Sequence, residues 1–379
     1  MGLLDRYRQF EAMTEEEVNA RLREEADERR RRALARVEPI DLSRTTWAEY
    51  PPSTVVNAIT FAARRGLHRY LDRHASELRA ELAARHGVPL ERLVVGGGAA
   101  QLLTTAAQAL IEHRPTASGR VCPDELITPW PSYPLYPVMA RRARGHAVPV
   151  SGFGVQPLLA AVNERTRIVA LCNPNDPTGE LLDLAGLDRL LGALPERVVV
   201  LLDEALRDFV SAEGRDATLA LLEDHPRLLV FRTFSKAWGL AGLRCGYALG
   251  GPGAEPLLEQ LAPELGLNEL AQAGVLEALR TSEALVAARA AGVAAERERL
   301  LGELRALGLE AAPSQANIVW LRADGIDGAD LAHRLDRQGV IVQSGGAFGD
   351  AAHVRVTVRR RDAGDRLLRA LGSALGRHG

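Results

Sequence analysis

Short, nearly continuous hydrophobic segments alternate with helical segments through the middle of this 379-residue chain. A strand that is hydrophobic on both sides belongs to a sheet covered by helices on both faces. Strands are predicted at 92–97, 125–130, 167–174, 197–204, 228–235 and 246–250, and helices at 75–86, 99–112, 131–144, 183–193 and 214–224. The pattern predicts an α/β fold, in which ligands usually bind beyond the strand ends.

The pattern changes after residue 265. A long helical segment at about 268–308, rich in Ala, Leu, Glu and Arg, precedes predicted strands at 316–321, 340–344 and 353–358, with a helix near 328–338 and a terminal helix. We expect a smaller α+β domain there. The predicted division is 1–65 as an N-terminal arm and part of the small domain, 66–265 as the large domain, and 266–379 as the C-terminal small domain.

The N-terminal segment has its own helix signal. Thr14 and Glu17 have the spacing of a capping box, which predicts a helix from residue 14 to about 37. Its apolar positions are sparse, so a free surface helix and an arm that lies on a partner both fit.

The composition excludes several classes of protein. The 47 basic and 49 acidic residues nearly cancel, so no overall positive field would attract nucleic acid or an anionic membrane. No apolar run approaches the ~20 residues of a membrane span, and the charged N-terminus lacks the apolar core of a signal peptide. Cys122, Cys172 and Cys245 lie far apart, which favours free thiols over disulfides or a metal site. We expect a cytoplasmic protein without a metal.

Lys236 is the only lysine beside 46 arginines. A guanidinium stays protonated and is a poor nucleophile, whereas an amine can lose its proton and attack a carbonyl group. Lys236 follows a predicted strand and lies among Phe, Trp and Leu residues. Burial there would lower the pKa of its amine, which predicts a catalytic role. A buried structural lysine paired with a carboxylate is the alternative.

The segment FRTFSKAWGLAGLRCGY at 231–247 resembles the fold-type-I pyridoxal-phosphate enzymes, the class I/II aminotransferases, and is most similar to the histidinol-phosphate aminotransferase branch. The resemblance spans about residues 66–360. It implies a large, mostly parallel seven-stranded sheet domain that binds pyridoxal 5′-phosphate and a smaller α+β domain. It also implies that Lys236 forms a Schiff base with the cofactor, while Ser235 and Arg244 hold the phosphate.

Other motifs add cofactor residues by the same resemblance. VVGGGAAQLL at 94–103 follows a strand and opens a helix, so Gly98, Ala99 and Ala100 would present backbone amides to the phosphate. VLLDEALRDF at 200–209 resembles the DEAY motif, which assigns Asp203 to the pyridine nitrogen, where a carboxylate keeps the ring an electron sink. WPSYPLY at 130–136 would lay Tyr133 against the cofactor ring.

Two departures surround the phenolic oxygen of the cofactor. LCNPNDPTG at 171–179 has Asp176 where the resembled motif has an asparagine, and Leu206 stands where DEAY has a tyrosine. An ionised Asp176 would repel an ionised phenolic oxygen. Either Asp176 is protonated, or the contact is made differently.

The resemblance assigns three further residues. Tyr70 in LHRYLD would reach the phosphate of the neighbouring subunit, which implies a homodimer with shared sites. Arg355 in HVRVTV would bind the substrate's carboxylate or phosphate, and Asn317 is a weaker substrate-binding candidate. The second anion-binding arginine of the family is replaced by Gln343, which argues against a histidinol-phosphate substrate.

Amino-group transfer between an amino acid or related amine and a 2-oxo acid is the function that these residues favour. Decarboxylases, lyases and oxygen-using enzymes share the implied fold, and the surroundings of the phenolic oxygen keep them open as alternatives. A non-catalytic sensor would need a fused DNA-binding module, and the first 60 residues show no such pattern. The sequence names neither donor nor acceptor.

Overall fold

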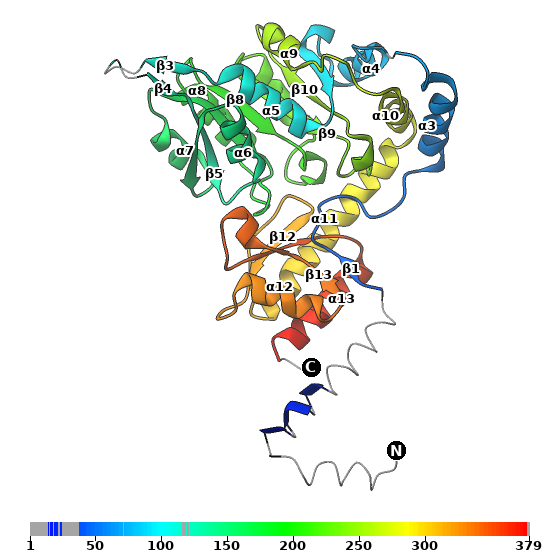
Figure 1. The fold of residues 1–379 in the computed structure, drawn as a ribbon, viewed down its shortest axis with the longest axis vertical. Coiled ribbons are helices and arrows are strands. Elements are labelled where there is room, and N and C mark those ends of the chain that lie inside the picture. Colours follow the sequence, from blue (N-terminus) through cyan, green and yellow to red (C-terminus); the bar gives the residue numbers. More distant parts are fainter. Residues whose placement is uncertain are drawn as a thin grey trace.

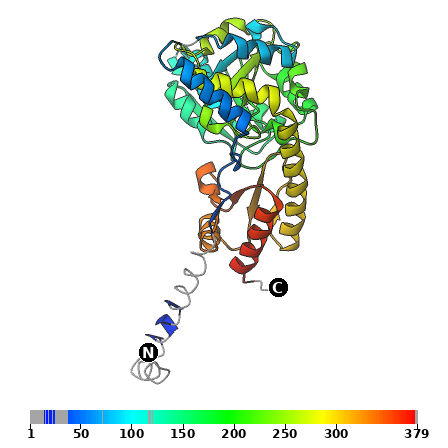
Figure 2. The same cartoon turned by 90° about the vertical axis from the view of Figure 1, so that its right-hand side faces the viewer.

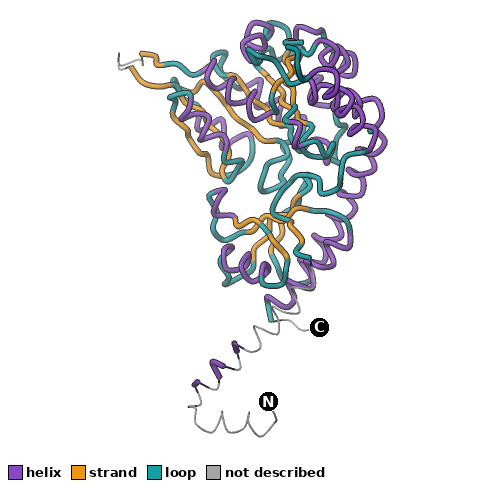
Figure 3. Tube along the Cα trace, turned by 45° about the vertical axis from the view of Figure 1, so that its right-hand side comes forward, coloured by secondary structure: helices purple, strands orange, loops and turns teal. Residues whose placement is uncertain are grey.

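The computed structural model describes residue 14 and residues 16–17, 19–21, 23–24, 38–70, 72–115, 119 and 121–376. The chain forms two bodies, each built around its own sheet (Figure 1). The long helix α11, Glu283–Ala306, runs from the larger body along the smaller one (Figure 2). Loops lie between the two groups of strands (Figure 3), so both sheets direct chain segments towards the region where the bodies meet.

The larger body contains a seven-stranded sheet with the order β2-β10-β9-β8-β7-β5-β6. Strand β10 is antiparallel to both neighbours, and the other pairs are parallel. The strands are β2 Leu93–Gly96, β5 Glu125–Trp130, β6 His146–Ser151, β7 Thr166–Cys172, β8 Val199–Asp203, β9 Leu228–Thr233 and β10 Gly246–Gly250. The predicted α/β fold with a mostly parallel seven-stranded sheet is confirmed.

Helices cover both faces of this sheet because successive strand residues point to opposite sides. In β8, Leu201 belongs to one hydrophobic cluster, while its neighbours Val200 and Leu202 belong to the other. The first face packs against α5 Ala99–Leu110, α6 Leu135–Arg142 and α9 Glu255–Leu261. The second packs against α4 Ser76–His86, α7 Val155–Ala161 and α8 Leu184–Ala193.

The smaller body contains a four-stranded antiparallel sheet with the order β11-β12-β15-β14. Its strands are β11 Glu310–Ala311, β12 Ile318–Arg322, β14 Gln343–Ser344 and β15 Val354–Thr357, with helices α12 Gly328–Asp336 and α13 Arg361–Ala374. A separate pair joins β1 Ile40–Asp41 to β13 Val340–Ile341 in parallel. The smaller α+β domain is therefore present.

The N-terminal segment connects the two bodies. After β1 the chain passes through residues 42–52 and enters α3 Ser53–Gly66, which packs on α10 Glu269–Thr281 at the larger body. Residues 42–49, which we call the strap, thus lie between the small sheet and the large one. The proposed domain boundaries at 65 and 265 stay a prediction.

Several local predictions differ from the structure. The strand predicted at 340–344 is two short strands in different sheets, Val340–Ile341 and Gln343–Ser344. The helical segment at 268–308 is two helices, because the chain breaks at Ser282, where two poor helix formers, Thr281 and Ser282, meet. Strand β6 was not predicted, since this edge strand is largely exposed and contains Pro149. The helix predicted at 214–224 is a 3₁₀ helix, Ala217–Leu222.

Two smaller elements complete the description. A hairpin joins β3 His113–Pro115 to β4 Val121–Pro123. At the N-terminus the Glu17 carboxylate accepts from the Thr14 amide over 2.9 Å, so the predicted capping box is present. Most of the predicted helix at 14–37 lies outside the described residues. None of the described helices has the length and apolar character needed to cross a membrane.

Candidate active site

The carboxyl ends of three adjacent strands gather the polar residues that the sequence analysis singled out. Asp203, the last residue of β8, is in register with Cys172 of β7 and Phe231 of β9. Lys236 follows the end of β9 by three residues. Parallel strands end at the same edge of a sheet, so Asp203 and Lys236 reach the same space.

A cavity of about 160 Å³ occupies this edge. It brings together eight of the predicted site residues: Ala99, Ala100, Tyr133, Asp176, Asp203, Ser235, Lys236 and Arg244. These residues come from six separate segments of the chain. The fold therefore assembles most of the predicted site in one place.

Lys236 is partly buried, and its surroundings favour the neutral amine. Burial lowers the pKa of Lys236, while the nearby Asp176 carboxylate opposes that shift. The amine donates to the Thr45 hydroxyl of the strap. A desolvated lysine with a lowered pKa is the form of this side chain that attacks carbonyl carbons.

Asp203 is buried at the floor of the cavity, and desolvation raises its pKa to about 6. The Ala205 amide donates to Oδ1 over 3.0 Å, and the Tyr136 hydroxyl donates to Oδ2 over 3.0 Å. These two donors fix the carboxylate in place. A cationic ring nitrogen beside Asp203 would restore the charge balance that burial disturbs.

The first turn of α5 forms a cradle for an anion. The first amides of a helix have no partner within the helix, and no side chain caps α5. Gly98 has φ +94°, and a Cβ there would lie 2.7 Å from Nη2 of Arg244. A Cβ on Gly246 would lie 2.5 Å from the Ala99 amide nitrogen. Both glycines therefore keep the cradle open beside Arg244.

Ser235 and Arg244 complete this cradle. Nη1 of Arg244 donates to the Ser235 hydroxyl over 3.4 Å. Helix amides, a hydroxyl and a guanidinium on one side of a cavity form a donor set suited to a phosphate group.

Tyr133 lines the same cavity. Burial raises the pKa of its hydroxyl, so the ring carries no charge at neutral pH. The rings of Tyr133 and Tyr136 meet edge to face, with centroids 5.9 Å apart. Tyr136 thus supports Tyr133 as well as Asp203.

Asp176 does not stand alone beside the cavity. Nη1 of Arg355 donates to its Oδ1 over 2.6 Å, and Nη2 of Arg355 donates to the Ser43 carbonyl over 2.6 Å. The guanidinium lies over the Phe348 ring, 4.7 Å from its centroid. Both expectations for the contact between Asp176 and the phenolic oxygen stay predictions. Leu206 is buried against the same cavity.

Three predicted site residues lie elsewhere. Tyr70 is fully exposed on the surface. Asn317 lines a neighbouring cavity. Arg355 does not line the active-site cavity but pairs with Asp176, which does. Sequence reasoning missed Tyr136 and the strap threonine Thr45. For Tyr136, the available signal was its place three residues after Tyr133, within the helix predicted at 131–144.

Residues 41–371 match the family model described as aminotransferase class I and II. The chain belongs to this family. Because the match covers both bodies and the strap, the seven-stranded sheet, the solitary lysine and the anion cradle are parts of an aminotransferase that depends on pyridoxal phosphate.

Named relatives agree with this membership. The aminotransferase is 38% identical to an aromatic amino acid aminotransferase of Corynebacterium efficiens, over 85% of this chain and 89% of the relative. It is 36% identical to histidinol-phosphate aminotransferase 1 of Nitrosococcus oceani, over 81% of each chain. The predicted similarity to the histidinol-phosphate branch is confirmed, together with a similarity to aromatic amino acid enzymes.

Solved structures share the fold. Histidinol-phosphate aminotransferase from Sinorhizobium meliloti, in complex with pyridoxal 5′-phosphate, matches with a TM-score of 0.78 at 25% identity, over 92% of this chain and 94% of that one. Aspartate aminotransferase from Thermus thermophilus, with maleate, matches with a TM-score of 0.77 at 25% identity, over 97% and 98%. The anion cradle, Asp203 and Lys236 fit the phosphate, ring nitrogen and aldehyde that this cofactor presents.

Proposed function

We propose that this aminotransferase moves an amino group between an amino acid or related amine and a 2-oxo acid, with Lys236 as its catalytic amine. Bound pyridoxal phosphate supplies an aldehyde for Schiff-base formation and a ring that withdraws electrons from the substrate's α-carbon. The observation that carries the proposal is the placement of Lys236 and Asp203 in one cavity with an open anion cradle.

The role of each residue follows from its position in the cavity. Asp203 would hold the proton of the ring nitrogen, and Tyr133 would cover the ring. Gly98, Ala99, Ala100, Ser235 and Arg244 would hold the phosphate. Lys236 would take a proton from the substrate's α-carbon and return it, which a partly buried amine with a lowered pKa can do.

The names of the relatives guide the choice of donors. Aromatic amino acids are the first donors to test, because seven of the similar relatives are named for them and each match covers more than four fifths of this chain. We expect Arg355 to contribute to binding of the substrate's carboxylate, once its pairing with Asp176 is relaxed or shared.

A homodimer with shared sites completes the proposal. Tyr70 is fully exposed, and Phe61 and Leu67 nearby are also exposed. A second copy on this face would bury them and bring Tyr70 to the partner's phosphate cradle. We also place the enzyme in the cytoplasm, since Cys122, Cys172 and Cys245 are free thiols.

Absorbance spectroscopy tests the catalytic proposal. The purified protein should be yellow, and borohydride should fix the cofactor to the chain through Lys236. The Lys236→Ala variant should lose the fixed adduct. Aromatic amino acids should convert the bound cofactor to its pyridoxamine form, and a 2-oxo acid should restore it. Release of carbon dioxide or peroxide without this conversion would overturn amino-group transfer and leave the cofactor site intact.

A further inference from the structure

Arg289 of α11 connects the turn that carries Lys236 to the strap. Its Nη1 donates to the Ala237 carbonyl over 2.9 Å, and its guanidinium lies over the Trp47 ring, 4.7 Å from the centroid. Ala237 is the residue after Lys236. Trp47 lies two residues after Thr45, whose hydroxyl accepts from the Lys236 amine. One side chain therefore holds both segments that meet at the reactive amine.

Arg289 is buried without a carboxylate against it. Its side chain is 7% exposed, and it forms no ion pair among the residues that the structure describes. Burial lowers the pKa of its guanidinium, with the Glu49 carboxylate opposing the shift. A buried charge without a paired carboxylate costs free energy, and an apolar side chain would fill the same space without that cost. The contacts to Ala237 and Trp47, rather than packing, are therefore what an arginine supplies at this position.

The turn after Lys236 has the shape that these contacts require. The Gly239 amide donates to the Lys236 carbonyl over 3.0 Å, which closes the turn. Gly239 has φ +74°, and a Cβ there would lie 3.1 Å from Nη1 of Arg289 and 3.5 Å from Cβ of Trp47. Glycine at this position thus allows the guanidinium and the strap to approach the turn closely.

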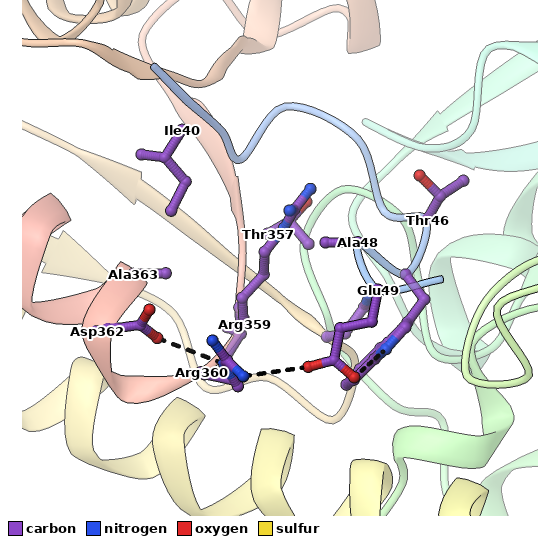
Figure 4. A pocket seen from close by; sticks show the side chains of 12 residues that line it. Ile40, Thr46, Ala48, Glu49, Thr357, Arg359, Arg360, Asp362 and Ala363 are labelled. Atoms are coloured by element: carbon purple, nitrogen blue, oxygen red, sulfur yellow. Dashed lines mark hydrogen bonds and ion pairs between the residues drawn. The ribbon is translucent and has the colours of Figure 1, made fainter. Parts of the chain in front are cut away.

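The smaller body holds the strap from the other side. Nδ2 of Asn317 donates to the Thr45 carbonyl over 3.1 Å. At the end of the strap, Glu49 pairs with Arg360 at 3.4 Å, and Figure 4 shows this ion pair among the residues that line the neighbouring cavity. These contacts fix the strap on the smaller body. Arg289 adds the link to the lysine turn of the larger body.

A lysine amine stands on a flexible four-carbon stem, so it needs a fixed partner to keep its place near a substrate's α-carbon. Resting on the amino-group transfer proposed above, we propose that Arg289 is a positioning residue for Lys236. It fastens Trp47 to the turn after Lys236 and thereby keeps the Thr45 hydroxyl against the amine. Arg289 lines neither the active-site cavity nor the neighbouring one, so it acts through the strap rather than on the substrate.

Kinetics of the holoenzyme with an aromatic amino acid test this role in proton transfer. Arg289→Met keeps a long side chain and removes both polar contacts. We expect kcat to fall about 10-fold and KM to change by less than about twofold, because the amine is misplaced while the substrate contacts remain. A substrate with deuterium at the α-carbon should slow the variant more than the wild type, since proton transfer then limits the rate. Arg289→Lys, which keeps a donor for Ala237 and a cation for Trp47, should recover most of kcat.

Arg297→Met is the matched control. Arg297 is also buried in α11, and its Nη1 donates to the carbonyls of Phe209 and Ala316 over 3.1 Å each. Neither partner lines the active-site cavity. This variant should lower the free energy of unfolding as Arg289→Met does, while kcat and the isotope effect stay within about twofold of the wild type.

The cofactor-free protein gives a readout that does not depend on turnover. Acetic anhydride acetylates the neutral amine of Lys236 faster as the pH rises, and mass spectrometry of the Lys236 peptide measures the rate. The Thr45 hydroxyl accepts from the amine and favours its protonated form. Thr45→Val and Arg289→Met should therefore each move this pH profile downward by about one pH unit. Loss of a nearby positive charge alone would move it upward, so the direction separates positioning from a direct effect of charge.

A double variant decides whether Arg289 acts through Thr45. Thr45→Val combined with Arg289→Met should move the pH profile no further than Thr45→Val alone. Additive shifts, an upward shift in Arg289→Met, or equal losses of kcat in Arg289→Met and Arg297→Met would each overturn the proposal. If no amino acid converts the cofactor, the proposed function fails, and the acetylation profiles still decide the role of Arg289. If Arg289→Met does not fold, Trp47→Leu breaks the same link from the strap.

Discussion

Nη1 of Arg355 lies 2.6 Å from Oδ1 of Asp176. Both side chains are buried, and they come from different bodies of the molecule, Asp176 from the loop after β7 and Arg355 from β15. The ion pair therefore joins the two bodies beside the reactive amine. It also occupies the arginine that the resemblance assigns to the substrate.

Replacing Asp176 by Asn should release Arg355 for the substrate. Asn keeps an acceptor for the guanidinium but removes the competing negative charge, so KM for an aromatic amino acid should fall about tenfold relative to KM for the matching amine without a carboxylate. Rapid measurement of cofactor conversion gives both values. Asp188→Asn, which removes an exposed carboxylate beside His225, should leave the ratio unchanged. An unchanged ratio in Asp176→Asn would contradict a competing role for Asp176.

The protein without cofactor should lose stability as the pH rises through about 6. Folding raises the pKa of Asp203 from 3.8 to about 6, so the stabilising protonated form is fully present below pH 3.8 and is lost above the folded value. Asp203→Asn resembles the protonated form. Its free energy of unfolding should exceed that of the wild type by up to ~3 kcal/mol at pH 8. Urea denaturation at pH 5 and pH 8 measures this difference. The same variant should bind the cofactor more weakly, and parallel pH curves for the two proteins would refute the assignment.

Tyr136→Phe should weaken binding of the cofactor while leaving the shape of the cavity unchanged. The hydroxyl donates to Asp203 Oδ2 over 3.0 Å, and its loss leaves the buried carboxylate with one donor fewer. The dissociation constant of the cofactor should rise about tenfold. The pH at which activity changes should also move upward, since the carboxylate is less stabilised. A lower free energy of unfolding with an unchanged pH profile of activity would indicate that Tyr136 has a structural role alone.

Mixed dimers test whether Tyr70 serves the partner's site. Tyr70→Ala and Lys236→Ala should each be strongly impaired as homodimers. Co-expression of the two with different tags should give a mixed dimer in which one site keeps both residues, so activity should return. The activity of the mixed dimer, purified through both tags in turn, is measured by a kinetic assay. A stable mixed dimer without activity would place Tyr70 outside the shared site.

Much of the fold could be predicted because its strands are hydrophobic on both faces. The exception is β6, an edge strand whose exposed positions carry His146, Pro149 and Ser151 and break the pattern. The break at Ser282 was also missed, since the helical composition continues on both sides of it. Local composition predicts well which strands are buried. It does not predict where a continuous helical sequence is divided into two helices.

The active-site residues close to strand ends could be predicted, because strand and helix signals locate them. Asp203 and Lys236 are examples. The pairing of Asp176 with Arg355 joins residues 179 positions apart, and no local pattern specifies it. The strap presented a similar difficulty, since the DLSRTTWAEYPPS segment has neither helical nor strand periodicity, yet it places Thr45 against Lys236.

The hydrogen bond between Lys236 and Thr45 offers a direct spectroscopic view of the site. Because the chain has a single lysine, protein made with isotope-labelled lysine would carry one labelled side chain, and that side chain lies in the active site. One magnetic resonance signal would then report the protonation of the Lys236 amine and the loss of its hydrogen bond to Thr45. The same signal would show, during turnover, whether the amine is free or bonded to the cofactor, without overlap from any other residue.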